Sequence, residues 1–412
     1  MQCRIDNVSH QGEGVARLNG KAVFIPWALP GELVEAEVTN SKKRFSTARL
    51  IEILEPSPKR VDPLCPHFYH CGGCSYQHTD YAEELRLKTQ VVGNALQRIG
   101  KVNTEVRPAL ASPREWRYRN KVTWHVVAGQ LGYYYQDSHK LLPIKTCHLI
   151  SAKMEELSQS VARALPPSTF TGEIIVRQSF TNDETLLLLK DLPPEARETV
   201  PSEVGKALDS IVCLEEGREK TRKGNPRLVE QIGGLGFSLS PQAFFQVNHD
   251  QAEKLVELVL QNLELTGRER VLDAYCGIGM FTLHLARHAR EVVGVEGFPA
   301  ATADAEENAR ANGIANCRFL TGSCEVVLTR EKEPFDAVVL DPPRSGCHPA
   351  VLQAIVRMAP SRIAYVSCHP ATLARDLAIL QSHGYQVSLV QPVDMFPRTH
   401  HVESIVLLLL QR

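Results

Sequence analysis

The stretch Val271-Leu272-Asp273-Ala274-Tyr275-Cys276-Gly277-Ile278-Gly279-Met280-Phe281 decides the fold of the C-terminal part of the chain. An apolar run that suits a buried strand leads into a loop with two glycines and then into a helix. Small residues at the carboxyl end of such a strand let a ligand approach the backbone at a helix N-terminus. A dinucleotide-binding loop would carry a third glycine at position 282, where Thr282 stands. NAD is therefore disfavoured.

Further apolar strands follow this loop and alternate with helical segments, which is typical of a parallel sheet with crossover helices. The strands are expected at 270–273, 291–295, 337–340 and 362–366. Glu296 ends the second of them, where a carboxylate can accept both hydroxyls of a ribose, and Asp341 ends the third. Glu296 alone would be an ordinary surface acid, but together these features suit S-adenosylmethionine. We expect a Rossmann-like class I methyltransferase domain over residues 236–412.

A thiol closes the next strand of this sheet, at Cys368, and Glu403 precedes the final apolar strand. Carbon 5 of uracil is too poor a nucleophile to take a methyl group unaided. A thiolate that adds to C6 activates C5, and a base must then remove the C5 proton so that the thiol can leave. Cys368 is the candidate nucleophile and Glu403 the candidate base. The alternative for Cys368, taken without its neighbours, is a buried structural thiol.

Four cysteines upstream form a possible metal-binding set. Cys65, Cys71 and Cys74 have the spacing C-x5-C-x2-C, and Cys147 lies 73 residues after Cys74. Four thiolates bind zinc or an iron–sulfur cluster, and the unequal spacing favours the cluster. The spacing differs from the C-x3-C-x2-C of radical enzymes. The alternative is a set of unpaired buried thiols.

The N-terminal region predicts two further domains. Residues 1–57 hold short β-rich runs with turn residues between them, as in a small OB-like barrel, and Lys42-Lys43-Arg44-Phe45 lies in a basic, aromatic loop. A proline-rich linker follows, and residues 58–235 read as a mixed α+β domain with a helix near Asp80–Arg98. The basic segment 114–121 is a second candidate for contacting nucleic-acid phosphates. For the barrel loop the alternative is a generic β-barrel with an exposed charged loop. For the basic segment a solvated surface is an equally good explanation.

Length and composition limit the class of protein. The chain has 412 residues and a net charge of −1, which suits two or three soluble domains. We find no apolar run long enough to span a bilayer and no signal-peptide pattern, and so expect a cytoplasmic protein without a membrane partner. Nothing in the sequence implies an obligate protein partner, and a monomer is expected.

Five short motifs make the resemblance to a family specific. They are Trp116–Lys121, Phe244–Asn248, Asp341–Gly346, Ser367–Pro370 and His401–Glu403. The chain resembles the RNA uracil-5-methyltransferase family over essentially its whole length, and the N-terminal barrel is similar to a TRAM domain. The resemblance implies that Gln246, Tyr275, Glu296 and Asp341 contact S-adenosylmethionine, that Cys368 is the nucleophile and that Glu403 is the base. It also implies that Cys65, Cys71, Cys74 and Cys147 hold a 4Fe-4S cluster.

Three residues depart from the family pattern. Met280 and His369 stand where relatives often have asparagine, and Ser323 stands where some have a cofactor-contacting asparagine. Two other classes compete: an amino-group methyltransferase, because Asp341-Pro342-Pro343 resembles the motif of those enzymes, and a non-catalytic RNA-binding or assembly protein. The barrel and the cysteine set favour ribosomal RNA as the substrate by analogy. Transfer RNA is the alternative.

Overall fold

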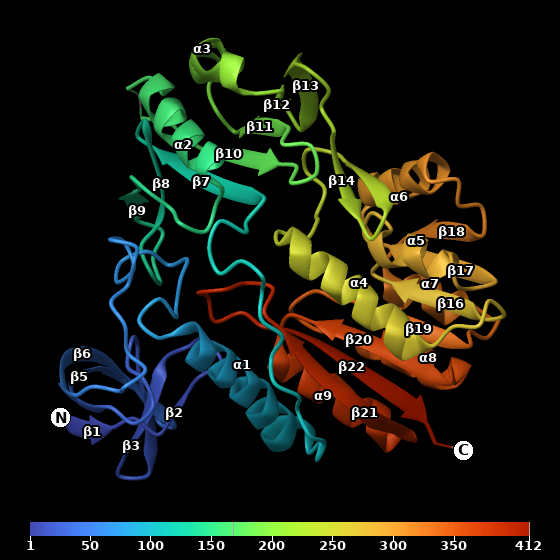
Figure 1. Cartoon of the computed structure of the whole chain (residues 1–412), viewed down its shortest axis with the longest axis horizontal. Coiled ribbons are helices and arrows are strands. Elements are labelled where there is room, and N and C mark those ends of the chain that lie inside the picture. Colours follow the sequence, from blue (N-terminus) through green and yellow to red (C-terminus); the bar gives the residue numbers. More distant parts are fainter. Residues whose placement is uncertain (168, 412) are drawn as a thin grey trace.

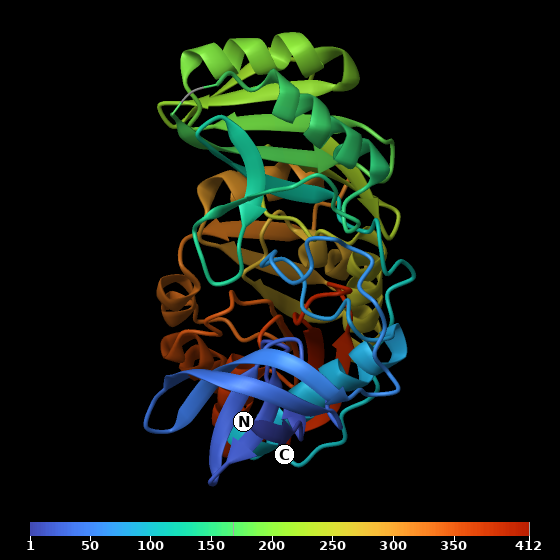
Figure 2. The same ribbon diagram turned by 90° about the vertical axis from the view of Figure 1, so that its left-hand side faces the viewer.

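The computed structural model describes residues 1–167 and 169–411 (Figure 1). An N-terminal barrel and a central sheet lie at opposite ends of the molecule, and a C-terminal α/β domain connects them (Figure 2). No helix in the described ranges combines the length and the apolar character that a bilayer crossing requires.

The N-terminal barrel is a six-stranded sheet in the order β1-β5-β6-β4-β3-β2. Its strands are β1 (Gln2–Arg4), β2 (Asn7–Val8), β3 (Gly14–Leu18), β4 (Lys21–Ile25), β5 (Leu33–Ser41) and β6 (Phe45–Glu55). In β5 the inward-facing Val34 and Ala36 are buried, as the alternating sequence predicts. The loop 42–45 joins β5 to β6, and the Lys42 ammonium lies 5.4 Å from the centre of the Phe45 ring. The expected barrel is therefore present.

Helix α1 (Tyr81–Ala95) starts where the sequence predicts it, because the Asp80 carboxylate caps it by accepting from the Glu83 N–H at 2.7 Å. A single π-helical turn, Leu96–Gly100, extends it. One side of α1 packs on the barrel and the other on the C-terminal sheet, where Val92 joins the main core. The helix thus belongs to the C-terminal layer rather than to the central sheet.

The central region is a seven-stranded sheet in the order β13-β12-β11-β10-β7-β8-β9, and it has the expected α+β character. Its strands are β7 (Lys121–Val127), β8 (Gln130–Tyr134), β9 (Leu141–Pro143), β10 (Thr171–Gln178), β11 (Thr185–Lys190), β12 (Ser210–Glu215) and β13 (Arg218–Lys223). Helices α2 (Ala152–Ala164) and α3 (Pro194–Val204), which a short 3-10 turn at Gly205–Ala207 follows, cover one face. Buried leucines in β11 pack on both faces of the sheet.

The C-terminal domain is a second seven-stranded sheet, ordered β18-β17-β16-β19-β20-β22-β21. The hairpin β14 (Leu228–Ile232) and β15 (Leu235–Leu239) leads into it. The strands are β16 (Arg270–Ala274), β17 (Glu291–Glu296), β18 (Cys317–Thr321), β19 (Ala337–Leu340), β20 (Arg362–Ser367), β21 (Tyr385–Val393) and β22 (Glu403–Leu410). The helices are α4 (His249–Leu263), α5 (Met280–Ala286), α6 (Pro299–Ala311), α7 (Cys324–Arg330), α8 (Pro349–Met358) and α9 (Pro370–Ser382).

Strands β16 to β20 are parallel, and β22 runs antiparallel between β20 and β21. Residues of α7, α8 and α9 form the core on one face of the sheet, and residues of α4, α5 and α6 form it on the other. The expected Rossmann-like domain is confirmed. The carboxyl ends of its parallel strands meet at one edge, where such folds bind their ligands.

Candidate active site

The glycine loop after β16 is a sharp turn that needs unusual backbone angles. Tyr275, Gly277 and Gly279 all have positive φ values, of 66°, 55° and 88°. A side chain on Gly294 in the neighbouring strand would meet Cys276 Sγ at 2.9 Å and the Phe319 ring at 2.7 Å. Close packing behind the loop thus requires a glycine and holds the loop at the sheet edge.

Glu296 anchors this loop from the end of β17. One of its carboxylate oxygens accepts from the Gly277 N–H at 3.0 Å, and the other accepts from the Phe298 N–H at 2.7 Å. The side chain is half-buried beside the loop. It lies where the sequence predicts a ribose-binding carboxylate.

Asp273 lies at the centre of the same edge and is fully buried. One of its oxygens accepts from the Thr282 hydroxyl at 2.6 Å, and the other has no hydrogen-bond partner among the described residues. Burial raises the pKa of Asp273 to about 7, and the nearby Glu296 adds to the rise. A buried carboxyl with an unpartnered oxygen is a place where a cationic or hydrogen-bond-donating ligand would be stabilised.

Asp341 and Glu403 continue the row of acids. Burial raises the pKa of Asp341 to about 7 and that of Glu403 to about 8, and each rise is increased by an acidic neighbour, Asp273 for Asp341 and Asp341 for Glu403. The Arg344 guanidinium opposes the rise at Glu403. At neutral pH this row therefore holds protons that a bound positive charge would displace.

Cys368 lies at the end of this row because of the strand order. It follows β20 directly, and β22 runs antiparallel to β20, so that Ser367 pairs with Ser404 and Glu403 begins β22 beside the end of β20. Cys368 is half-buried, and burial together with Glu403 raises the pKa of its thiol to about 11. The structure thus brings the candidate nucleophile, the candidate base and Asp341 together.

A pocket of about 120 Å³ opens in front of Cys368. Arg344, His369, His400 and His401 line it from the C-terminal domain, and His10 and Gln11 line it from the barrel. The Arg344 guanidinium lies 3.1 Å from His401 Nε2. Residues of the N-terminal barrel therefore form one side of the pocket at the carboxyl edge of the C-terminal sheet.

Tyr275 and Gln246 lie on segments that border this edge. Tyr275 is half-buried, and burial beside Cys347 raises the pKa of its hydroxyl. Gln246 is buried just before α4, on a segment that Asn248 ties to the loop before Glu403 by donating to the Met395 carbonyl at 3.2 Å. Both positions fit residues that line the ligand-binding edge.

The residues that depart from the family pattern have other contacts. Met280 is buried in the core at the start of α5. Ser323 precedes α7 without capping it by its side chain, and its Cα lies 4.0 Å from the position that a Cβ on Gly297 would take. His369 caps α9 by accepting from the Thr372 N–H at 3.4 Å. Met280 therefore serves packing instead of a polar contact.

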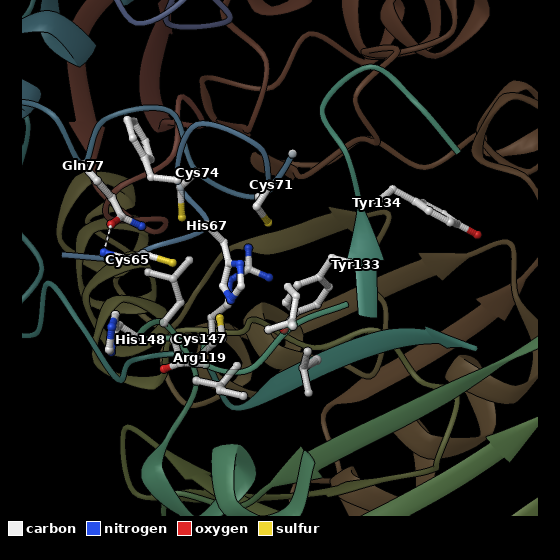
Figure 3. A pocket seen from close by; sticks show the side chains of 18 of the residues that line it. Cys65, His67, Cys71, Cys74, Gln77, Arg119, Tyr133, Tyr134, Cys147 and His148 are labelled. Carbon is white, nitrogen blue, oxygen red and sulfur yellow. Dashed lines mark hydrogen bonds between the residues drawn. The ribbon is translucent and has the colours of Figure 1, made fainter. Parts of the chain in front are cut away.

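A separate cavity of about 520 Å³ lies between the linker region and the central sheet (Figure 3). Cys65, Cys71, Cys74 and Cys147 all line it, and burial raises the pKa of the Cys71 thiol to about 11. Within residues 1–167 and 169–411, no three His, Cys, Asp or Glu side chains are grouped tightly enough to hold one metal ion.

Arg119 also lines this cavity, beside Cys147 in Figure 3. Its Nε is buried and has no hydrogen-bond partner among the described residues. A cation with an unused donor suits an anionic occupant. The donor set and the cation therefore fit a thiolate-bound iron–sulfur cluster.

Sequence reasoning missed three features of these sites: the buried Asp273, the unpartnered Nε of Arg119 and the barrel residues His10 and Gln11. Asp273 lies in the glycine-loop motif 271–281 and Arg119 in the motif Trp116–Lys121, so both motifs could have indicated a functional role for these residues. No sequence pattern near His10 indicates that it lines the same pocket as Cys368, which lies more than 350 residues later in the chain.

Comparisons with known proteins agree with this geometry. Residues 234–411 match the family described as tRNA (Uracil-5-)-methyltransferase, and residues 3–51 match the TRAM domain. An uncharacterized RNA methyltransferase of Halalkalibacterium halodurans is 37% identical over 99% of this chain and 96% of its own length. Another, of Caldanaerobacter subterraneus subsp. tengcongensis, is 38% identical over 98% and 96%.

A solved structure covers the same length. The tRNA (uracil-54, C5)-methyltransferase of Pyrococcus abyssi, in complex with S-adenosyl-L-homocysteine, matches with a TM-score of 0.79 and 25% identity over 99% of this chain and 100% of its own. The relatives match this chain over nearly its full length, and two of its domains match the corresponding family models. The acids and the thiol at the sheet edge are consistent with the same family. The chain belongs to the RNA uracil-5-methyltransferase family.

Proposed function

We propose that this protein transfers a methyl group from S-adenosylmethionine to carbon 5 of a specific uridine in RNA, through a covalent bond between Cys368 and C6. The observation that carries the proposal is the placement of Cys368, Glu403 and Asp341 at the carboxyl edge of the C-terminal sheet. An amino-group methyltransferase needs no thiol at this place, and a simple RNA-binding protein needs neither the thiol nor the base.

The cofactor would occupy the edge between the glycine loop and Asp341. Glu296 is placed to accept from ribose hydroxyls, and Gln246 and Tyr275 border the same edge. Bound there, S-adenosylmethionine supplies an electrophilic methyl group on a positively charged sulfur. Asp273 and Asp341, whose pKa values burial raises, become better stabilised as carboxylates next to that charge.

The chain's own residues carry the remaining steps. The Cys368 thiolate adds to C6, and the electron pair of the C5–C6 double bond becomes available at C5 to attack the methyl group. The C5 proton then passes to Glu403, the double bond forms again and the thiolate leaves C6. Arg344 stabilises the anionic forms of both groups, because it lowers the pKa of Cys368 and of Glu403.

The target base must leave its stack to reach a half-buried thiol, so the uridine is flipped out of the RNA. The barrel loop 42–45 and the segment 114–121 are our candidates for phosphate and stacking contacts with the flanking strand. Within 114–121, Arg114 and Arg117 already pair with Asp250 and Glu155, so the loop 42–45 is the first candidate. Ribosomal RNA is our first candidate, by analogy with the barrel and the four-cysteine set. Transfer RNA is the second, because the Pyrococcus abyssi relative acts on tRNA. We further propose that the enzyme acts on RNA in the cytoplasm and as a monomer.

Cys65, Cys71, Cys74 and Cys147 would hold a 4Fe-4S cluster, with Arg119 compensating its negative charge. Methyl transfer moves no electrons, so the cluster would order the loop between the linker and the central sheet. Anaerobically purified protein should be brown and carry about four irons per chain. Stoichiometric zinc without iron would overturn the cluster.

The covalent mechanism has a direct test. RNA with 5-fluorouridine at the target position should form a stable adduct with the enzyme, because fluorine cannot leave C5 as a proton does. Cys368→Ala should abolish the adduct and turnover while it keeps cofactor affinity. Cys317→Ala is the matched control, since Cys317 is another half-buried thiol of the same domain, on β18. Full turnover by Cys368→Ala would refute the mechanism.

The RNA substrate is identified by mapping 5-methyluridine in total RNA with and without the gene. Loss at one ribosomal position or at one transfer RNA position decides between the two candidates. An unchanged map would refute uridine methylation altogether.

A further inference from the structure

The turn between β2 and β3 of the barrel is built as a rigid projection. The Ser9 hydroxyl accepts from the backbone N–H groups of Gln11 and Glu13 at 3.1 and 3.2 Å and donates to the Glu13 carboxylate at 2.9 Å. The Ser9 and Glu13 backbones are also hydrogen-bonded, at 2.8 Å. This leaves the tip, His10 and Gln11, exposed on a fixed base.

The projection is wedged against the catalytic domain. Gly12 is buried with a φ of 82°, and a side chain on it would come within 3.3 Å of Ser75, Tyr76 and His400. Val8 and Leu29 of the barrel also share a buried cluster with residues of α1. The tip is therefore held in one place relative to Cys368.

The tip lies at the mouth of the pocket in front of the nucleophile. His10 and Gln11 line this pocket together with Cys368, and the His10 and His369 rings lie 5.8 Å apart in an edge-to-face arrangement. Cys368 is half-buried, whereas both tip residues are exposed. A nucleotide that occupies this pocket in front of the thiol would lie against the tip.

We propose that the Ser9–Glu13 turn is the rim of the catalytic pocket and grips the unpaired nucleotide next to the flipped uridine. The proposal deepens the uridine methylation proposed above and rests on it. An imidazole offers a face on which a base stacks, and a carboxamide offers one donor group and one acceptor to a base edge. The barrel then takes part in choosing the target as well as in holding the RNA backbone.

The rim differs physically from the basic barrel loop 42–45. The tip, His10 and Gln11, includes no lysine or arginine, so we expect its contact with RNA to depend mainly on stacking and hydrogen bonds. Such contacts keep their strength in high salt, whereas phosphate contacts weaken as salt rises. Salt dependence therefore separates the two parts of the barrel.

The test uses the full-length protein and synthetic RNA hairpins around the mapped uridine, with 5-fluorouridine at the target. The double variant His10→Ala, Gln11→Ala should form the adduct on the order of tenfold more slowly than the parent, equally at low and high salt. Gln2→Ala, a change at an exposed glutamine on β1 of the same barrel, should match the parent.

Two further hairpins, abasic at the 5′ or at the 3′ neighbour of the target, separate gripping from a structural role. The parent should slow about tenfold on one of them, and the double variant should lose nothing more on that hairpin. Additive losses on both hairpins, or a double variant equal to Gln2→Ala, would overturn the proposal. If the parent forms no adduct, the methylation mechanism fails, and equilibrium binding of the same hairpins decides the rim by the same comparison.

Discussion

Binding of S-adenosylmethionine should release protons from the catalytic edge. Asp273 and Asp341 have raised pKa values of about 7, because Asp273 is buried, Asp341 is largely shielded from water, and each lies near another acid. At pH 7 each carboxyl is then about half protonated, and a cation beside them favours the carboxylates. Ionising both releases about one proton per chain. The release should increase as the pH is lowered toward 6 and decrease as it is raised toward 8.

The assay is calorimetric titration of the protein with S-adenosylmethionine in buffers of different ionisation enthalpy, such as phosphate and Tris. The slope of binding heat against buffer ionisation enthalpy gives the number of protons. S-adenosyl-L-homocysteine is the control ligand, because it lacks the sulfonium charge, and it should release fewer protons. Asp273→Asn should cut the release at pH 7 by about half a proton. Equal heats in both buffers at pH 6 and pH 7 would refute the reasoning.

Three other changes test separate parts of the site. Glu403→Gln should stall after methyl transfer, so that a methylated covalent complex accumulates on a denaturing gel; a variant that neither turns over nor accumulates adduct would make Glu403 structural. Neutralising Lys42, Lys43 and Arg44 together should raise the KM for RNA and flatten its salt dependence without changing cofactor affinity, and unchanged RNA binding at every salt concentration would exclude this loop as a clamp. Gly294→Ala should weaken cofactor binding, because its Cβ would lie 2.9 Å from Cys276 Sγ behind the glycine loop; a parental dissociation constant would show that the loop absorbs the clash.

The sequence predicted the catalytic edge because parallel strands share one polarity. Once 270–273, 291–295, 337–340 and 362–366 are taken as parallel strands, the residues that follow them must meet at one edge. Glu403 lies at the same edge for a different reason. The motif His401–Glu403 indicated its role, but the series of apolar strands did not explain its position. Strand β22 enters the sheet antiparallel, so its first residue lies beside the last residue of β20.

The packing between distant segments was beyond sequence reasoning. The pattern of α1 shows that the helix has buried positions, but it does not say which domain covers them. The helix packs on the C-terminal sheet and on the barrel at once. The same limit applies to His10, whose position depends on how the barrel docks and on no property of its neighbours in the chain.

The cysteine loop docks on the catalytic domain, and this contact would let the proposed cluster affect methylation without a redox role. Ser75 and Tyr76, next to Cys74, both donate from their backbone N–H groups to the Arg398 carbonyl, at 2.9 and 3.1 Å. The Ser75 hydroxyl also lies 3.0 Å from His400 Nδ1. Arg398 and His400 precede Glu403 by a few residues, and His401 lines both the cysteine cavity and the pocket of Cys368. A group bound at Cys74 would therefore also order the segment that leads to Glu403, the proposed base, with no electron transferred.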